Sequence, residues 1–322
     1  MWLSFTEGLG FGQQNFYPTH SGADGYSRKR PIQSQVPGVE SSEVNIGDFV
    51  DFENFSVART SSDSAKPVLP SPTRPNPSPV SSNPDGVAGR IGEYRKSFTA
   101  SNGKSSEFLI EVPPGIRQKK YGLLVYVHGD TAVDYTGQWQ TVKRMARKYG
   151  LVALSVKSPS RSREQGTSWW MDADKNADYL NELLQKEVLG KYNIDKNRTV
   201  FTGQSGGPTF LTGPWIKRYA SQFRGGALLL CGSRVRTNFT PRNWTPDFLN
   251  NFKMVFVNGR QDFLYDLARA AARDYRASGF NVETDFSGNY GHCAFRNGVQ
   301  YEMDRGLASI LGSSRSSLVA SR

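Results

Sequence analysis

The sequence has few of the residues that bind metals or cross-link small domains. Its 322 residues include only two cysteines and three histidines. A disulfide framework requires several cysteine pairs, and a zinc site requires a cluster of cysteine or histidine ligands. The chain also lacks the H-E-x-x-H and G-x-x-x-x-G-K motifs that hold zinc and nucleotide phosphates. The sequence therefore predicts no metal site and no cofactor.

Long apolar runs are missing too. No stretch of about eighteen apolar residues occurs, and the N-terminal segment MWLSFTEGLGFGQQ has neither a basic start nor a sustained apolar run. We therefore expect neither a membrane-spanning helix nor a Sec signal peptide. The default prediction is a cytoplasmic protein. A protein associated with a phage or virus particle, or exported without a signal peptide, would share these absences.

Basic residues are concentrated after the N-terminal part of the chain. Residues 1–88 contain six basic and nine acidic side chains, a net charge of −3, and the remaining 34 basic and 20 acidic side chains give +14. Such an excess attracts anionic substrates or surfaces, whereas scattered charge on a basic enzyme is the simpler alternative. No basic helix with interleaved aromatics and no nucleic-acid-binding motif occurs, so no nucleic-acid partner is expected.

The N-terminal head differs in composition from the rest. Residues 66–84, KPVLPSPTRPNPSPVSSNP, are rich in proline and serine, which is typical of an extended or disordered linker. Residues 47–57, GDFVDFENFSV, form a short acidic and aromatic patch. This patch suggests a docking site for a protein partner, although a plain linker is the simpler alternative. We predict a disordered head at 1–88, one catalytic domain at 89–312 and a flexible tail at 313–322.

From Gly92 onward, apolar segments alternate with amphipathic ones. The alternation indicates β-strands joined by crossover helices, and hence an α/β fold with a mostly parallel sheet flanked by helices. Strands are predicted at residues 108–112, 123–127, 151–156, 200–202, 227–231, 254–257 and 282–286, and helical stripes at 139–146, 177–188 and 264–275.

A G-x-S-x-G pentapeptide is the strongest functional signal. The segment TVFTGQSGG, residues 199–207, joins a short apolar run to this pentapeptide, and residues with helical spacing follow it. The bare pattern would occur by chance in roughly a third of chains of this length and composition, so the order of strand, serine and helix carries the prediction. Such a turn exposes its serine, which makes Ser205 the candidate nucleophile. Pro214 is expected to kink or restart the following helix.

A nucleophilic serine needs a base, and the sequence offers three histidines. His20 lies in the polar head. His128 ends an apolar run and begins His128-Gly129-Asp130, which looks like a loop that supplies backbone amides to an oxyanion. His292 follows the last predicted strand, in the place that the order serine, acid, histidine gives to the base. We therefore predict His292 as the base.

The base in turn needs an orienting carboxylate. Asp262 follows the apolar run and glycine turn of FKMVFVNGRQD, ahead of the strand that precedes the histidine. A carboxylate there would fix the imidazole tautomer and stabilise the imidazolium. Asp266, one helical turn later, is the second candidate. Glu283 and Asp285 are weaker candidates because they lie within a predicted strand.

The segment YNIDKNRTVFTGQSGG resembles the region around the nucleophile in the polyhydroxybutyrate depolymerase and feruloyl esterase branch of the α/β-hydrolases. The His-Gly loop and the late acid and histidine add to the resemblance. It implies an α/β-hydrolase fold in which Ser205 is the nucleophile, His292 the base and Asp262 the acid. It also implies an oxyanion hole made by the backbone amides of Gly206 and Asp130.

The chain departs from the family pattern within residues 92–311, the part that the resemblance covers. Gln204 replaces a more usual leucine, and Gly206 replaces a frequent alanine. These departures predict a looser oxyanion turn and a different substrate. The secretion signal and polymer-binding module that usually accompany a depolymerase are not recognisable in the sequence.

Aromatic side chains suggest the walls of a substrate cleft. Trp169 and Trp170 lie in the loop SRSREQGTSWWMD, and Trp244 follows arginines at positions 234, 236 and 242. Together with Gln204 beside the nucleophile, these residues predict binding of an aromatic or anionic ester. The alternative for the tryptophans is packing beneath loops.

The two cysteines fall at the predicted edge of the active site. Cys231 ends a predicted strand, and Cys293 follows the candidate base. A disulfide between them would hold the histidine loop in place, and two buried thiols are the alternative.

Together these features predict a serine hydrolase that cleaves a carboxylic ester through an acyl-enzyme intermediate, as an esterase or a depolymerase-like enzyme. A peptidase or amidase on the same fold is one alternative. Another is a non-catalytic hydrolase-fold protein with a structural or interaction role, although such a module has no need of a serine, an acid and a histidine together. The fold alone does not choose the acyl group or the alcohol.

Overall fold

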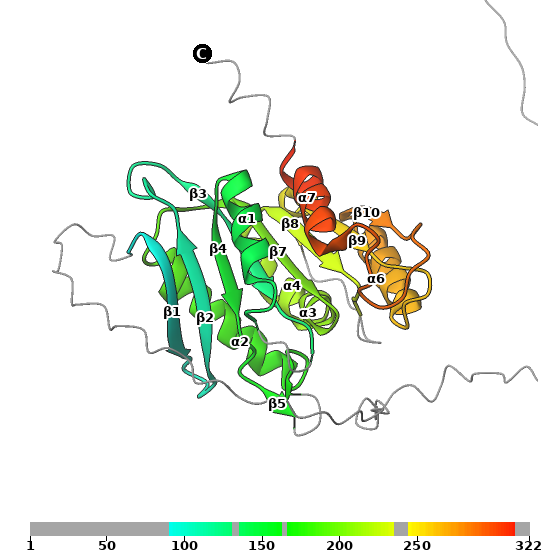
Figure 1. The fold of residues 1–322 in the computed structure, drawn as a ribbon, viewed down its shortest axis with the longest axis horizontal. Helices are drawn as coiled ribbons and strands as arrows, with labels where there is room; N and C mark the ends of the chain where they lie inside the picture. Colours follow the sequence, from blue (N-terminus) through cyan, green and yellow to red (C-terminus); the bar gives the residue numbers. More distant parts are fainter. Residues whose placement is uncertain (1–89, 131–134, 163–165, 235–243, 313–322) are drawn as a thin grey trace, which may run out of the picture. The chain divides into compact units, whose positions relative to one another are not determined.

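The computed structural model describes residues 90–130, 135–162, 166–234 and 244–312 (Figure 1). The predicted head and tail, and with them the acidic and aromatic patch at 47–57, lie outside the described residues. The boundaries of the three predicted segments and the docking role of the patch therefore stay predictions.

An eight-stranded sheet forms the centre of the described part, in the order β1-β2-β4-β3-β7-β8-β9-β10 (Figure 1). β2 pairs antiparallel with β1 and with β4, whereas all other neighbours are parallel. The predicted mostly parallel sheet is thus confirmed. The strands are β1 Gly92–Thr99, β2 Ser105–Val112, β3 Tyr121–Val127, β4 Leu151–Val156, β7 Ile194–Gln204, β8 Gly225–Leu230, β9 Phe252–Val257 and β10 Asn281–Asp285.

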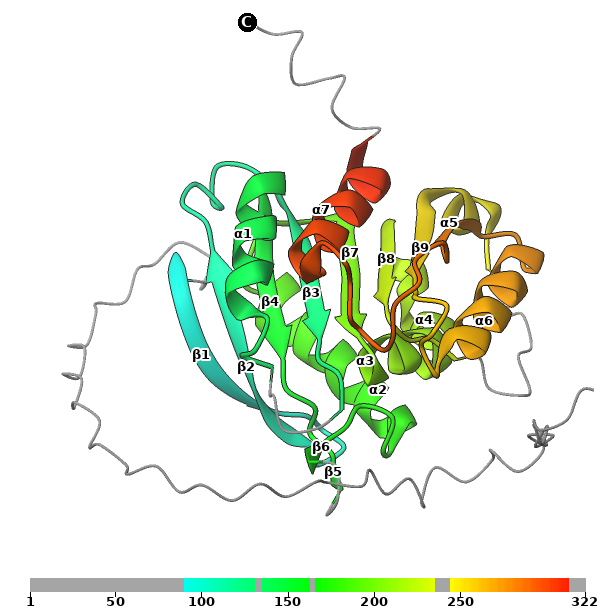
Figure 2. The ribbon, with the colours of Figure 1, turned by 45° about the vertical axis from the view of Figure 1, so that its right-hand side comes forward.

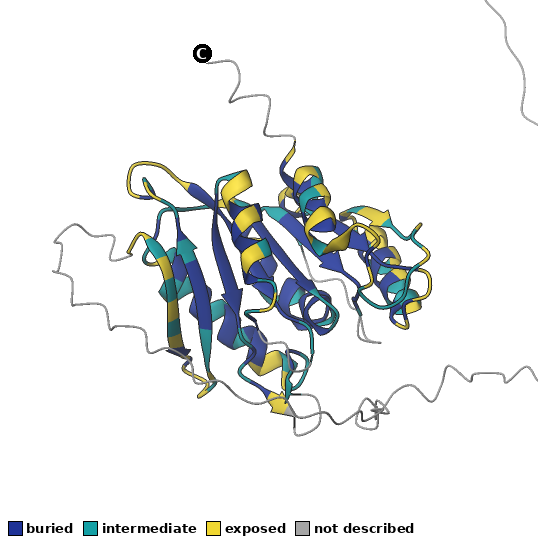
Figure 3. Cartoon of the chain, in the orientation of Figure 1, coloured by how far each residue is buried: buried dark blue, intermediate teal, exposed yellow. Residues whose placement is uncertain are grey.

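Helices cover both faces of this sheet (Figure 2). Met145 of α1 and Leu307 of α7 belong to one apolar cluster, and Leu180 of α2 and Tyr275 of α6 belong to another. The helices turn their polar residues outward, so that exposed positions lie on the side away from the sheet (Figure 3). The helices are α1 Trp139–Tyr149, α2 Ala173–Leu183, α3 Gly206–Phe210, α4 Ile216–Tyr219, α5 Pro246–Asn251, α6 Tyr265–Ala277 and α7 Gly298–Leu311.

The central strands read as continuous apolar runs because both of their faces are covered. Every residue of β3, YGLLVYV, and of β4, LVALSV, is buried. A parallel strand between two helical layers has no solvent face, so its sequence does not alternate. This is why the apolar runs located these strands correctly.

Some elements were not predicted. The edge strand β1, GEYRKSFT, has mostly exposed and half-buried positions and no apolar run. A small hairpin, β5 Arg161–Ser162 and β6 Gly166–Thr167, has strands of two residues each. The helices α5 and α7 were missed as well. β1, β5, β6 and α5 lack the length or the apolar periodicity to be recognised from sequence, whereas α7, with buried Met303, Leu307, Ile310 and Leu311 at helical spacing, carried a signal that the prediction missed.

The helix after the serine is interrupted at Pro214, as predicted. A π-helical turn, Leu211–Trp215, contains the proline and joins α3 to α4. Proline lacks the backbone N–H that an α-helical turn needs, and its ring crowds the preceding turn. The wider turn accommodates both effects and lets the chain continue in helical form.

Candidate active site

The turn after β7 holds Ser205 in an uncommon backbone conformation. The strand ends one residue before Ser205 and α3 begins one residue after it, and Ser205 itself has φ 56° and ψ −115°. A positive φ is strained for a residue with a Cβ. A Cβ on Gly203 or Gly207 would lie 2.2 or 2.3 Å from the backbone oxygen of Val127. The glycines therefore allow β3 to pass close to this strained turn, as the G-x-S-x-G pattern predicts.

Ser205, His292 and Asp262 form a hydrogen-bonded chain. Nε2 of His292 lies 2.8 Å from Oγ of Ser205, and Nδ1 lies 2.9 Å from Oδ1 of Asp262. The Asp262 side chain is fully buried, and its Oδ1 also accepts a 2.8 Å hydrogen bond from the backbone N–H of Leu264. A carboxylate that accepts from Nδ1 keeps the proton there, which leaves Nε2 free to accept the proton of the serine. Three residues chosen from the sequence thus meet in space.

The other candidate carboxylates lie in ion pairs on the surface of the domain. The side chain of Asp266 is 89% exposed. Hydrogen bonds from Ser309 to Glu283 and from Ser287 to Asp285 hold the two β10 carboxylates in place. The ion pairs are Asp266 with Arg269, Glu283 with Lys253 and Asp285 with Arg305.

A disulfide joins Cys231 to Cys293, so the bridged alternative is confirmed and the alternative of two buried thiols is wrong. Cys231 directly follows β8, and Cys293 directly follows His292. Figure 2 shows the loop before α7 reaching across the ends of the strands toward the start of α3. A 3.2 Å hydrogen bond from the backbone N–H of Gln261 to the carbonyl of Tyr290 ties this loop to the loop of the acid. The bridge and this contact together hold the imidazole at the serine.

His128 has a structural role. The residue is buried, its Nε2 accepts a 2.9 Å hydrogen bond from the backbone N–H of Ser158, and its Nδ1 lies 2.6 Å from the carbonyl oxygen of Gly129. Because a carbonyl only accepts, Nδ1 carries the proton and the imidazole is neutral. Both ring nitrogens are engaged in shaping the loop after β3, which agrees with the choice of His292 as the base.

The loop after β3 lies against the serine turn. A Cβ on Gly129 would lie 3.0 Å from the backbone oxygen of Gln204 and 3.1 Å from Cβ of Ser205. The next residue, Asp130, reaches Gly206, because a Cβ on Gly206 would lie 2.5 Å from either carboxylate oxygen. The two residues predicted to supply oxyanion amides are therefore neighbours in space.

The two tryptophans of the loop between β4 and α2 have different surroundings. Trp169 is fully buried, with its ring centroid 4.8 Å from that of Phe210 and 5.9 Å from that of His128. It therefore packs beneath the loop and does not form a cleft wall, because its indole fills the space between α3 and the His-Gly loop. Trp170 is half-buried, and its Nε1 donates a hydrogen bond to Oδ2 of Asp130.

The remaining predicted substrate residues are also anchored by neighbours. Oε1 of Gln204 accepts a 3.1 Å hydrogen bond from the hydroxyl of Tyr126. Trp244 is half-buried and packs edge-on against Phe280, with 4.7 Å between ring centroids. This contact agrees with the alternative that Trp244 packs beneath a loop and does not line a substrate cleft. The arginines at positions 236 and 242 lie outside the described residues.

Phe263 is a site residue that the sequence did not reveal. Its side chain is 64% exposed, yet its ring centroid lies 4.3 Å from that of His292. Among the described residues, the exposed large hydrophobic side chains are those of Ile91, Phe263 and Tyr301, and Phe263 is the most exposed of the three. Proximity to the acid Asp262 in the chain was the available signal, but an isolated phenylalanine in a turn does not indicate which side it faces.

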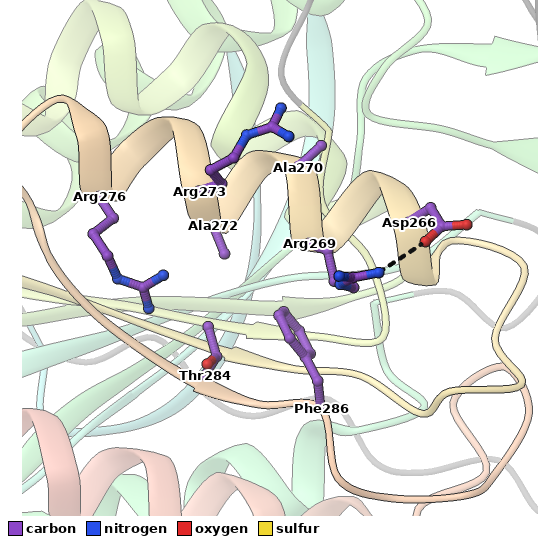
Figure 4. Close-up of a pocket in the computed structure, with 8 residues that line it drawn as sticks. All are labelled: Asp266, Arg269, Ala270, Ala272, Arg273, Arg276, Thr284 and Phe286. Atoms are coloured by element: carbon purple, nitrogen blue, oxygen red, sulfur yellow. Dashed lines mark ion pairs between the residues drawn. The ribbon is translucent and has the colours of Figure 1, made fainter.

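A pocket of about 400 Å³ lies between α6 and β10 (Figure 4). Three arginines of α6 line it, and Arg269 pairs with Asp266, the pocket residue nearest to Asp262 in the chain. The triad residues are not among its walls. The lining residues are Asp266, Arg269, Ala270, Ala272, Arg273, Arg276, Thr284 and Phe286.

Two further observations concern the described residues only. They contain no group of three or more histidine, cysteine, aspartate or glutamate side chains arranged to hold a metal ion. Within the same ranges, no helix combines the length and the apolar character needed to cross a membrane.

Comparisons with known proteins find similarity in structure alone: no protein-family model and no curated protein matches the sequence. One of two fungal esterases from Rhizomucor miehei is 15% identical, with a TM-score of 0.52 over 71% of this chain and 84% of that chain. A hyperthermophilic esterase from Pyrobaculum calidifontis is 14% identical, with a TM-score of 0.51 over 70% of this chain and 87% of that chain. With its parallel sheet, flanking helices and serine turn, the chain has the α/β-hydrolase fold.

Proposed function

We propose that this protein is a serine hydrolase that cleaves a carboxylic ester through an acyl-enzyme intermediate. The hydrogen-bonded chain Ser205–His292–Asp262 on a strained strand-to-helix turn carries the proposal. The esterases of similar fold support an ester as substrate. An esterase or a depolymerase-like enzyme fits equally well, because the site accounts for the bond that is cleaved and not for the length of the substrate.

The geometry suits a two-step mechanism. As Oγ of Ser205 attacks the ester carbonyl carbon, Nε2 of His292 takes its proton, and Asp262 stabilises the imidazolium that forms. The backbone amides of Gly206 and Asp130 hold the negative oxygen of the tetrahedral intermediate, where one such donor is worth about 10²–10³ in rate.

The intermediate then breaks down to products. His292 returns the proton to the alkoxide oxygen of the leaving group, so the alcohol departs and leaves an acyl group on Ser205. In the second step water attacks the acyl carbon while His292 takes a proton from it, and Ser205 is released with a carboxylic acid as the product.

Two features outside the triad support an aromatic or anionic substrate. The exposed ring of Phe263 beside His292 offers an apolar face to a group attached at the ester. Arg269, Arg273 and Arg276 line the α6 pocket, and a substrate carboxylate there would compete with the exposed ion pairs of Arg269 with Asp266 and of Arg273 with Asp274. An ester that joins an aromatic acid to an anionic partner would use both.

The test is labelling of the intact protein by a fluorophosphonate, followed by mass, with turnover of p-nitrophenyl acetate and butyrate on the same samples. Wild type should gain one label and hydrolyse both esters, and Ser205→Ala should do neither. Ser221→Ala changes an exposed serine away from the triad and should behave as wild type. A folded wild type that takes no label would leave the non-catalytic interaction protein as the better hypothesis. Faster turnover of p-nitroanilides than of matched esters would indicate an amidase or peptidase.

A further inference from the structure

The carboxyl group of Asp130 fills the space beside Gly206. A Cβ on Gly206 would lie 2.5 Å from both carboxylate oxygens and 2.6 Å from Cγ of Asp130, so an alanine there would require the Asp130 side chain to move. The glycine that stands where the resembled family often has alanine thus has a steric reason. A carboxyl group occupies the volume that a side chain at this position would take, and the looser turn predicted from the glycine stays a prediction.

The two oxygens of this carboxyl differ in their hydrogen bonding. Trp170 donates to Oδ2, whereas Oδ1 is buried with no hydrogen-bond partner among the described residues. Ser168 Oγ faces the group without reaching good hydrogen-bond geometry. Burial raises the pKa of the Asp130 carboxyl, against the lowering effects of Ser168, Trp170 and the charge of His292. Ser168, Trp170 and His292 are thus the side chains that lower the pKa of the Asp130 carboxyl.

The position of the carboxyl matters for the charge that develops in the reaction. Asp130 supplies one of the two proposed oxyanion amides, and its side chain touches the residue that supplies the other. A carboxylate there would add a buried negative charge beside the oxyanion hole and repel the oxyanion, because screening by water is weak in a buried site. A protonated carboxyl would carry no such charge.

We propose that Asp130 gives the ester hydrolysis an alkaline limit: the reaction proceeds while its side chain is a neutral carboxylic acid and slows when it becomes a carboxylate. This inference rests on the proposed function of Ser205. Asp130 contributes to the chemistry through its backbone amide, and its side chain regulates the strength of the oxyanion hole. The carboxylate would also favour the imidazolium of His292, and the inference is that repulsion of the oxyanion is the larger effect because the carboxyl touches Gly206.

The test compares kcat/KM for p-nitrophenyl butyrate in wild type and Asp130→Asn from about pH 5 to about pH 9, where histidine bases and carboxyls with raised pKa values titrate. Asparagine keeps an oxygen to accept from Trp170 but cannot ionise. The ratio of variant to wild type should be constant at the acid end and then rise through one ionisation by about tenfold or more. Asp247→Asn, which neutralises an exposed carboxylate at the start of α5, away from Ser205 and from the α6 pocket, should give a ratio independent of pH.

A second variant tests the same idea without changing Asp130. Trp170→Phe removes the donor that favours the carboxylate, so the alkaline fall in wild-type activity should move to higher pH. The pH profile of Trp170→Phe tests the inference even if Asp130→Asn does not fold.

A steric cycle tests the contact itself. Gly206→Ala should lower kcat/KM more in the wild type than in an Asp130→Ala background, where the carboxyl oxygens that would clash are gone. Equal effects in both backgrounds would mean that the two residues do not share this space.

A variant-to-wild-type ratio that is flat or falls with pH in folded protein would overturn the inference. In that case fluorophosphonate labelling and wild-type turnover would still be intact, so the proposed function would survive. A wild type that is never labelled would instead refute the proposed function directly.

Discussion

Removal of the disulfide should lower the stability of the domain by a measurable amount. The bridge joins cysteines separated by 62 residues. In the chain-entropy model a closed loop of this length is worth about 4 kcal/mol in the free energy of unfolding. For a domain of this size each kcal/mol corresponds to roughly 2–4 °C in Tm. The double variant Cys231→Ala/Cys293→Ala is therefore expected to melt roughly 8–16 °C below wild type.

The same change should affect catalysis through the position of the base. Cys293 follows His292 directly, and without the bridge the loop depends on backbone contacts such as the 3.2 Å bond between Gln261 and Tyr290. A misplacement of about 1 Å costs up to about 10² in rate. We expect kcat to fall by roughly ten to a hundredfold, with a smaller change in KM.

Alanine is the better replacement because Cys231 is fully buried and a serine hydroxyl there would be an unsatisfied polar group. Thermal unfolding and p-nitrophenyl butyrate turnover should be measured without reductant, with reduced wild type as the second sample. Reduced wild type should match the double variant in both Tm and kcat. Equal melting of oxidised wild type and variant, or alkylation of both thiols in unreduced wild type, would refute the reasoning.

The bridge also bears on where the protein resides. The cytoplasmic default stays a prediction. A disulfide persists in oxidising compartments and is rare where thiols are kept reduced, so the bridge weighs against that default.

Three further predictions concern the triad, the aromatic wall and the serine turn. Asp262→Asn should lower kcat by about 10⁴ in steady-state assays, because it weakens control of the imidazole tautomer; an effect confined to KM would contradict this role. Phe263→Ala should raise KM for p-nitrophenyl esters more than for ethyl esters, whereas Tyr301→Ala, at an exposed aromatic elsewhere, should change neither. Gly207→Ala places a Cβ 2.3 Å from the oxygen of Val127 and should cost about 1–3 kcal/mol in urea unfolding, so an unchanged midpoint would refute the close approach.

Local pattern was enough to locate the central strands and most of the long helices. β3 and β4 are buried throughout because they lie between two helical layers. Each strand can therefore be recognised from a short run of consecutive apolar residues. The edge strand β1 has a solvent-facing side and a mixed composition, so the same reasoning did not find it. Whether a strand could be predicted from sequence therefore depended on how completely the strand is buried.

The candidate triad was accessible to sequence reasoning for a different reason. The chain contains only three histidines, and the order of serine, acid and base along the chain is a property of the fold topology. Pattern left Asp262 and Asp266 as alternatives one helical turn apart. Distance decided between them, because Asp262 reaches Nδ1 of His292 and Asp266 points into solvent.

The amino-acid sequence by itself determined the α/β layering and the serine turn and predicted His292 as the base, because each depends on neighbouring residues or on their order along the chain. Only the tertiary structure decided that Trp169 is buried, that Phe263 packs against the imidazole of His292, and that Cys231 and Cys293 are bridged. It alone placed the carboxyl of Asp130 against Gly206. These contacts join residues far apart in the chain, and whether such residues touch depends on how the loops after different strands converge at one edge of the sheet.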